Sequence, residues 1–172
     1  MKLISVLITV CLFAMSSNLD NKVNNFNDCS AQLIVEKDRS FKSADEDGAQ
    51  FILVLTNTSR DTKTFYLSAR NLTAPCNNNN TQYHRRAASG NSNLNVSFQG
   101  YDLSRNRINT TPSNEVQLRS GESYKFIVNA TVPNGTPFNT WSCIEVEAKS
   151  EDCGSKSETT ILSVYVPDPS EG

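Results

Sequence analysis

From Leu33 onward the chain consists of short runs of β-forming residues separated by turn-forming residues, and this pattern constrains the fold most strongly. The runs alternate apolar and polar residues with the period of a strand, and no window has the period of an amphipathic helix. The predicted strands cover residues 33–36, 50–56, 64–69, 94–98, 115–118, 123–132, 142–149 and 158–166. About eight strands at this spacing predict an all-β fold, an antiparallel β-sandwich.

The same alternation predicts which side chains face the core. The predicted inward set is Phe65, Leu67, Ala69, Tyr124, Phe126, Val128, Ala130, Val132, Ile144, Val146 and Ala148. Cys143, Glu145, Glu147 and Lys149 have the opposite parity and should face outward. Residues 50–56 are apolar on both faces, as expected of a central strand.

The first residues of the chain are organised like an export signal. Lys2 precedes an apolar stretch over residues 3–13, and Ala14 to Ser16 provide the small residues of a cleavage site. This stretch is too short to cross a hydrocarbon core of about 30 Å. We expect residues 1–16 to be a cleaved signal peptide, and no second apolar stretch predicts a membrane span in the mature chain.

The rest of the chain divides into three predicted parts. A polar, Asn-rich leader covers residues 17–32, the sandwich covers residues 33–167, and a tail covers residues 168–172. Pro167 and Pro169 end the last strand, because proline lacks the N–H that a sheet ladder needs. Within the sandwich, residues 70–110 form a long irregular segment, and a loop of such length indicates either function or disorder.

Cysteine usage indicates the compartment. Loss of the signal peptide leaves an even number of cysteines, which are Cys29, Cys76, Cys143 and Cys153. In an exported chain this predicts two disulfides and a secreted, periplasmic or cell-surface location. A zinc site is a poor alternative, since no two cysteines are spaced as closely as in a C-x-x-C pair.

The order of the strands predicts how these cysteines pair. Cys143 opens a strand and Cys153 follows its far end, so their Cα atoms should lie ~20 Å apart, beyond the reach of a disulfide. If successive strands alternate in direction, Cys29 and Cys143 share one end of the sandwich. Cys76 and Cys153 then share the other end. We therefore predict the pairs Cys29–Cys143 and Cys76–Cys153, a prediction that depends on the number of strands within residues 70–110.

Composition and motifs exclude several classes of function. The net charge of −2 and the pI of about 5.4 leave no basic surplus for nucleic acid or anionic lipid. His84 is the single histidine, and Arg85 and Arg86 beside it disfavour its protonated form. The sequence has no nucleophile elbow, zinc-protease motif or phosphate loop. We therefore expect that the protein is not an enzyme and uses no cofactor.

Two groups of residues are candidate ligand sites. The first is a weak calcium candidate made of three carboxylates, Asp45, Glu46 and Asp47. These residues lack the spacing of a calcium loop, so a solvated turn is the simpler interpretation. The second is a set of aromatic side chains that could stack on a sugar, Trp141, Phe138 and Tyr101. The alternative for Trp141 is structural, as a cover over the open end of the core.

Asn-x-Ser/Thr triplets are frequent. Their asparagines are Asn57, Asn71, Asn79, Asn95, Asn109, Asn129 and Asn134. In a eukaryotic secretory pathway, such triplets are glycan acceptors where the chain exposes them. In a bacterial protein their number carries little meaning.

Two passages resemble a known class of domain. Residues 48–58 read as a strand that ends in a Thr-Asn turn, and residues 116–137 contain a Gly-Glu turn, a long β run and a Val-Pro pair. Over residues 33–167 the chain resembles the Ig-like or fibronectin-type-III-like modules of bacterial exported and cell-surface proteins, of the kind attached to alpha-galactosidases. The resemblance implies a structural or binding module without catalytic residues. The long segment 70–110 and the four cysteines depart from this family.

These observations together predict a secreted, non-catalytic interaction or adhesion module whose partner is an unknown protein or glycan at the cell surface. A carbohydrate-binding accessory protein is one alternative, and a fibre or pilus component is another. Binding by β-augmentation at an edge strand or through the loops is expected. Residues 17–28 are too polar to serve as a donor strand.

Overall fold

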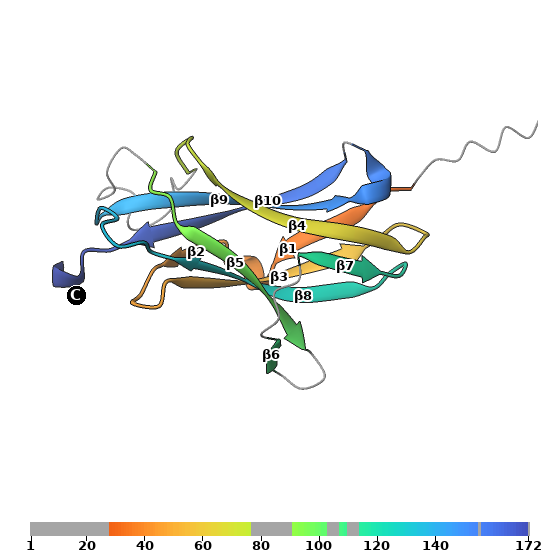
Figure 1. Ribbon diagram of the computed structural model, residues 1–172, viewed down its shortest axis with the longest axis horizontal. Helices are drawn as coiled ribbons and strands as arrows, with labels where there is room; N and C mark the ends of the chain where they lie inside the picture. Colours follow the sequence, from red (N-terminus) through yellow and green to blue (C-terminus); the bar gives the residue numbers. More distant parts are fainter. Residues whose placement is uncertain (1–27, 77–90, 103–106, 110–113, 155, 172) are drawn as a thin grey trace, which may run out of the picture.

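Two five-stranded sheets pack face to face in the computed structural model, which describes residues 28–76, 91–102, 107–109, 114–154 and 156–171 (Figure 1). The first sheet contains, in spatial order, β1 (Ala31–Val35), β3 (Ala49–Asn57), β8 (Ser123–Thr131), β5 (Asn95–Asp102) and β6 (Arg107–Asn109). The second contains β2 (Phe41–Ser43), β10 (Ser157–Val166), β9 (Thr140–Ser150), β4 (Lys63–Leu72) and β7 (Glu115–Leu118). Three short 3-10 turns complete the described elements, η1 (Glu36–Asp38), η2 (Glu151–Cys153) and η3 (Pro169–Glu171).

The order of the strands identifies the sandwich as Ig-like. Seven strands correspond to the seven strands of an Ig domain. Strands A, B, D and E correspond to β1, β3, β5 and β8, and strands C, F and G correspond to β4, β9 and β10. The neighbours β1-β3-β8-β5 then form the A-B-E-D sheet, and β10-β9-β4 form the G-F-C sheet. Every pair of named strands is antiparallel except β2 with β10. The predicted fold class is confirmed.

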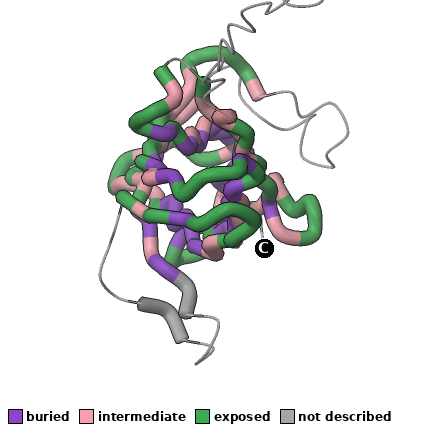
Figure 2. The backbone as a smooth tube through the Cα atoms, turned by 90° about the vertical axis from the view of Figure 1, so that its right-hand side faces the viewer, coloured by how far each residue is buried: buried purple, intermediate pink, exposed green. Residues whose placement is uncertain are grey.

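The core lies between the sheets, where buried residues line the inside of both layers (Figure 2). The predicted inward side chains of β4, β8 and β9 all belong to this core or pack against it. Ala69, Tyr124 and Val132 are its partly buried members. The β3 side chains Phe51, Leu53 and Leu55 are fully buried, in agreement with its central place in the sheet.

Two short strands differ from the prediction. β2 and β6 have three residues each, too few for an alternating pattern to be recognised in the sequence. β1 begins at Ala31, so the last two residues of the predicted leader belong to the sheet. Part of the segment predicted to be irregular is regular, since β4 extends to Leu72 and β5 and β6 follow. The predicted signal peptide, most of the leader and His84 lie outside the described residues.

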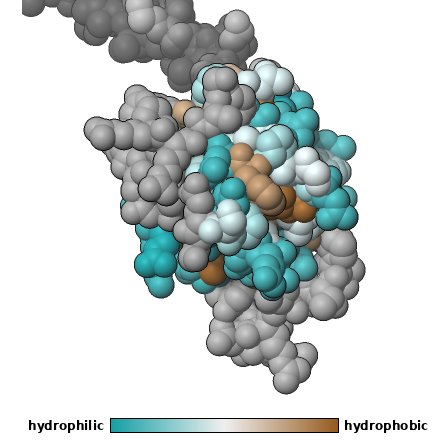
Figure 3. All heavy atoms as spheres, turned by 90° about the vertical axis from the view of Figure 1, so that its left-hand side faces the viewer, coloured by the Kyte–Doolittle hydropathy of each residue, from teal (hydrophilic) through white to brown (hydrophobic). Residues whose placement is uncertain are grey.

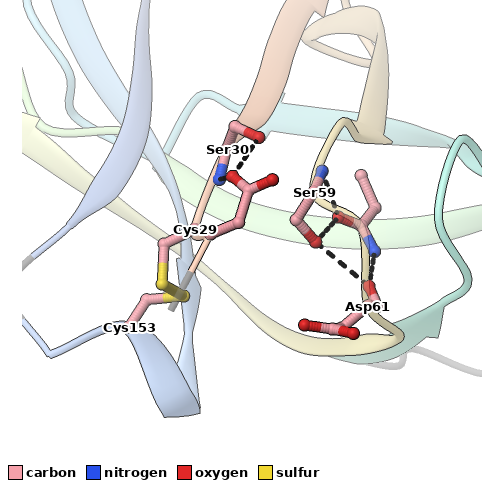
Figure 4. Close-up of a disulfide and its surroundings, with 7 residues drawn as sticks. Cys29, Ser30, Ser59, Asp61 and Cys153 are labelled. Carbon is pink, nitrogen blue, oxygen red and sulfur yellow. Dashed lines mark hydrogen bonds between the residues drawn. A yellow bond between two sulfur atoms is a disulfide. The ribbon is translucent and has the colours of Figure 1, made fainter. Parts of the chain in front are cut away.

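The two disulfides join Cys29 to Cys153 and Cys76 to Cys143, with Cα–Cα distances of 5.6 and 5.4 Å. Figure 4 shows the first of them. The prediction that Cys143 and Cys153 do not pair with each other is confirmed. The predicted pairs Cys29–Cys143 and Cys76–Cys153 are wrong. Each disulfide staples one end of the sandwich, but the partners are exchanged.

The exchange follows from the strand count. β6 pairs antiparallel with β5 and adds one reversal of chain direction that the sequence pattern does not show. Every later strand therefore runs opposite to the predicted direction, and Cys143 and Cys153 change ends. The other missed strand, β2, has no such effect, because it runs in the same direction as β1 after the turn η1.

Within the described ranges, no helix has the length and apolar character needed to cross a bilayer.

Candidate functional site

A groove of about 400 Å³ opens between β4 and β5, at the side of the sandwich where the two sheets face each other. Its lining residues are Leu67, Ser68, Ala69, Val96, Ser97, Phe98 and Asn114. Leu67 and Phe98 are buried core residues, and Ala69 and Val96 pack against them. None of the lining side chains is charged, so the groove has an apolar floor and a polar, neutral rim. The alternating pattern correctly predicted the strands that hold all of these residues except Asn114, but it contains no signal that the two strands face each other.

The strand edges that border this groove are open. β7 pairs with β4 only as far as Tyr66, and one further bond joins the Leu67 N–H to the Asn114 carbonyl at 2.6 Å. Alternate residues of a strand direct their peptide groups to the same side, so Ala69 also points its N–H and carbonyl toward this edge. Beyond Asn114, no described strand pairs with this part of β4. Unpaired backbone groups of this kind are a template for a further strand.

The β5 edge is open in the same way. β8 pairs with one side of β5, and β6 pairs with the other side only at Gly100–Asp102. The opposite side of residues 95–99 has no strand partner among the described residues. Among the described residues, the groove therefore has backbone without a strand partner on both walls.

Next to the groove, hydrogen bonds connect β4 to the chain just before β5. The Asn71 side chain donates to the Leu94 carbonyl at 2.9 Å and accepts from the Leu94 N–H at 3.1 Å. Its Oδ1 also accepts from the Ser142 hydroxyl at 3.2 Å. Because Asn71 belongs to β4 and Leu94 directly precedes β5, this one side chain connects the two sheets.

The loop between β8 and β9 exposes an aromatic side chain. Phe138 is 54% exposed, the highest value among the large hydrophobic residues of the described chain. The loop lies at the left-hand end of Figure 1, and Figure 3 looks onto this end, where a small hydrophobic area lies among hydrophilic residues. Of the two members of the predicted aromatic set whose side chains the structure describes, Phe138 and Trp141, Phe138 is the exposed one.

Trp141 is too buried to serve as the candidate sugar platform. It is only 5% exposed and lies between Phe41 and Tyr165, with ring centroids 5.3 and 5.2 Å away. Its outward parity was predicted correctly, since Tyr165 is its cross-strand neighbour on the outer side of the second sheet. Aromatic partners from β2 and β10 bury it there, which local parity does not indicate. The Tyr101 side chain lies outside the described residues.

The carboxylates of Asp45, Glu46 and Asp47 lie on an exposed turn between β2 and β3. Asp45 Oδ1 accepts from the Asp47 N–H at 3.0 Å, and Asp45 pairs with Gly48 to close the turn. In the described part of the chain, no group of three or more His, Cys, Asp or Glu side chains is placed to hold a metal ion. The cluster acts as a turn.

The fold divides the glycosylation triplets by exposure. Asn57 and Asn129 are buried, and Asn71 is engaged with Leu94. Asn95 and Asn134 are exposed, on β5 and in the β8–β9 loop. Asn79 and the Asn109 side chain lie outside the described residues.

No protein-family model and no curated protein matches the chain. A family 123 glycoside hydrolase from Clostridium perfringens matches 81% of this chain and 27% of its own length, with 12% identity and a TM-score of 0.49. A FixG-related protein from Vibrio parahaemolyticus matches 81% of this chain and 95% of its own, with 10% identity and a TM-score of 0.43. The E. coli chaperone DraB matches 81% and 55%, with 11% identity and a TM-score of 0.41. The chain thus spans about a quarter of the hydrolase, and similarity at this level assigns no function.

Proposed function

We propose that the protein is a non-catalytic interaction module of an exported compartment and that it binds a short protein segment in the groove between β4 and β5. The two disulfides support an oxidising location, secreted, periplasmic or at the cell surface. The finer resemblance, to modules of bacterial exported proteins such as those attached to alpha-galactosidases, is part of the same proposal.

The groove carries this proposal because it combines two features of strand-addition sites. Its walls offer open backbone edges on β4 and β5, which provide hydrogen bonds without regard to sequence. Its floor of Leu67, Ala69, Val96 and Phe98 selects apolar side chains. A neutral lining favours an uncharged segment, because a charge buried there would lose its hydration without gaining a partner.

Carbohydrate binding, the first alternative, has lost its main support. The face of Trp141 is covered, and one exposed phenylalanine is a small platform for a sugar ring. The groove has no aromatic side chain at its rim. We therefore prefer a protein partner.

Peptide titration of the isotope-labelled, disulfide-intact protein tests the proposal. The probe is a short neutral peptide that alternates valine and threonine, and the matched control peptide has serine in place of each valine. We expect the valine peptide to shift the amide signals of Ala69 and Val96, with a dissociation constant of about 0.1–1 mM for so small a contact. The serine peptide should leave these signals unchanged.

Variants separate this site from other surfaces. Ala69→Leu fills the floor of the groove and Asn114→Glu places a charge at its mouth, so each should abolish the peptide-induced shifts. Ile161→Ser removes an apolar side chain that is 49% exposed on the outer face of the second sheet and should bind as the wild type does. Equal shifts with both peptides, or shifts that survive both groove variants, would show that the groove is not the binding site.

A further inference from the structure

Phe138 is presented to solvent by a loop of defined shape. The Thr136 hydroxyl and N–H both donate to the Pro133 carbonyl, at 2.7 and 3.2 Å. The Thr140 hydroxyl donates to the Pro137 carbonyl at 2.7 Å. These bonds brace the loop on both sides of Phe138.

The residue after Phe138 anchors the loop to the body of the domain. Asn139 has a φ of 56°, in the left-handed region that non-glycine residues seldom occupy. Its N–H donates to the Val166 carbonyl at 2.7 Å, and its Oδ1 accepts from the Tyr165 hydroxyl at 2.6 Å. An exposed aromatic side chain on a braced loop loses little conformational entropy on binding, which is the property of an interface anchor.

The surroundings of Phe138 distinguish it from the other exposed hydrophobic residues. Tyr66 lies opposite Lys149, and Ile161 lies opposite Glu145, so burial of either would also desolvate a charge. Ile34 is close in sequence to the Glu36–Lys125 ion pair. Residues 133–140, in contrast, contain no charged side chain. Phe138 therefore has no charged residue within its own loop, although Asp168 follows Val166, which the loop contacts.

The groove between β4 and β5 matches this loop in chemistry. It is uncharged, it is floored by apolar side chains, and its volume of about 400 Å³ exceeds that of one phenylalanine side chain. The loop lies at one end of the sandwich and the groove lies along one side, so the two surfaces do not coincide. Each copy of the chain thus has one apolar anchor and one apolar receptor.

We propose that the segment bound in the groove is the Phe138 loop of a second copy, so that the protein self-associates head to tail. This inference rests on the proposed function of the groove and names its partner. A contact between two different surfaces is heterologous and extends into a ring or an open chain of copies. The contact is small, so we expect assembly only at about 0.1–1 mM protein.

Sedimentation equilibrium of the disulfide-intact protein tests this inference. The wild type should show a weight-average mass that at least doubles, roughly, between about 0.05 and 1 mM, as open-ended association at this affinity requires. Phe138→Ser and Asn114→Glu should each remain monomeric, because one lacks the anchor and the other has a blocked groove. Ile161→Ser, which removes an exposed apolar side chain elsewhere, should assemble like the wild type.

A mixture of the two deficient variants gives the sharpest test. Phe138→Ser keeps an open groove and Asn114→Glu keeps Phe138, so together they should form dimers that cannot grow further. Ala69→Leu should replace Asn114→Glu in this mixture with the same result. A wild type that stays monomeric at 1 mM, or a Phe138→Ser variant that assembles normally, overturns the inference. If the wild type stays monomeric but still binds the valine peptide, the proposed function stands and only the identity of the partner is wrong.

Discussion

Asn57 is fully buried at the end of β3, and its amide group makes every hydrogen bond available to it. It donates to the Asp61 and Leu118 carbonyls at 2.8 and 2.9 Å. It accepts from the Ser59 N–H and hydroxyl at 3.0 and 2.6 Å, and part of this network is visible in Figure 4. One side chain thus ties the β3–β4 turn to the end of β7.

Replacement of Asn57 by alanine should lower the free energy of unfolding by about 2–4 kcal/mol, because the buried Leu118 carbonyl loses this donor and the buried Ser59 loses its acceptor. Urea denaturation measures the loss. The matched control is Asn95→Ala, since Asn95 is exposed on β5 and its loss should cost no more than about 0.5 kcal/mol. Equal losses in the two variants would contradict the structural role of Asn57.

Glu36 forms an ion pair with Lys125 at 2.6 Å that joins the turn after β1 to β8. The hydrogen bond from Lys125 lowers the pKa of Glu36 below its ordinary value of 4.5. A carboxyl group whose pKa is lowered by folding stabilises the protein above its unfolded pKa, and this stabilisation disappears as the pH falls through the folded value. Hydrogen bonds from Ser30 and Ser170 lower the pKa values of Asp28 and Asp168 in the same direction.

The free energy of unfolding should therefore decrease as the pH falls below 4.5. Glu36→Gln should show a smaller decrease, because it has no proton to take up at this site. Lys125→Met should flatten the curve in the same range by removing the partner. Denaturation curves collected between about pH 3 and pH 6 measure the slopes, and parallel curves for wild type and Glu36→Gln would refute the assignment.

The turn between β2 and β3 depends on a close approach of backbone. Gly48 has a φ of 97°, and a Cβ at this position would meet the carbonyl oxygen of Ala130 and lie 2.9 Å from the Thr131 Cα. Gly135 also has a positive φ, 84°, but a Cβ there would meet nothing within 4 Å. Alanine substitutions at Gly48 and Gly135 therefore distinguish two losses of stability. At Gly135 the loss comes from the left-handed backbone alone, and at Gly48 a steric clash of the added Cβ with β8 contributes as well.

Gly48→Ala should destabilise the protein by about 3 kcal/mol or more, since β2–β3 and β8 must move apart. Gly135→Ala should cost about 1 kcal/mol, the penalty for the left-handed conformation alone. Thermal denaturation of both variants measures the difference. Similar melting temperatures for the two would mean that the turn does not press against β8.

For the whole molecule, the disulfides decide how firmly the two sheets are held together. Cys29–Cys153 ties the start of β1 in the first sheet to the β9–β10 turn of the second, and Cys76–Cys143 ties the chain after β4 to β9. Each crosslink closes a long loop, of 124 and 67 residues in sequence separation. The chain-entropy model predicts a stabilisation of about 4–5 kcal/mol from each.

Peptide mapping without reduction should recover Cys29 linked to Cys153 and Cys76 linked to Cys143. The double variant Cys76→Ser/Cys143→Ser should lose about 2–5 kcal/mol of stability while the other disulfide still forms. The same map after reduction and alkylation is the control. A peptide linking Cys29 to Cys143 would restore the pairing predicted from the sequence and would contradict the observed path of β6.

The features that were predicted correctly are local ones. Alternation with a period of two depends only on neighbouring residues, so the eight longer strands, their inward faces and the sandwich class were predicted correctly, while the three-residue strands β2 and β6 were missed. The outward parity of Trp141 and the separation of Cys143 from Cys153 followed from the same rule.

The tertiary structure decided everything that depends on which strands meet. β6 is too short to leave a pattern, yet its one reversal determined the ends at which Cys143 and Cys153 lie and hence their partners. Trp141 is buried because β2 and β10 bring Phe41 and Tyr165 beside it. The groove exists because two open edges from different sheets face each other. Contacts between residues distant in the chain are set by the packing of the sheets, and no local period records them.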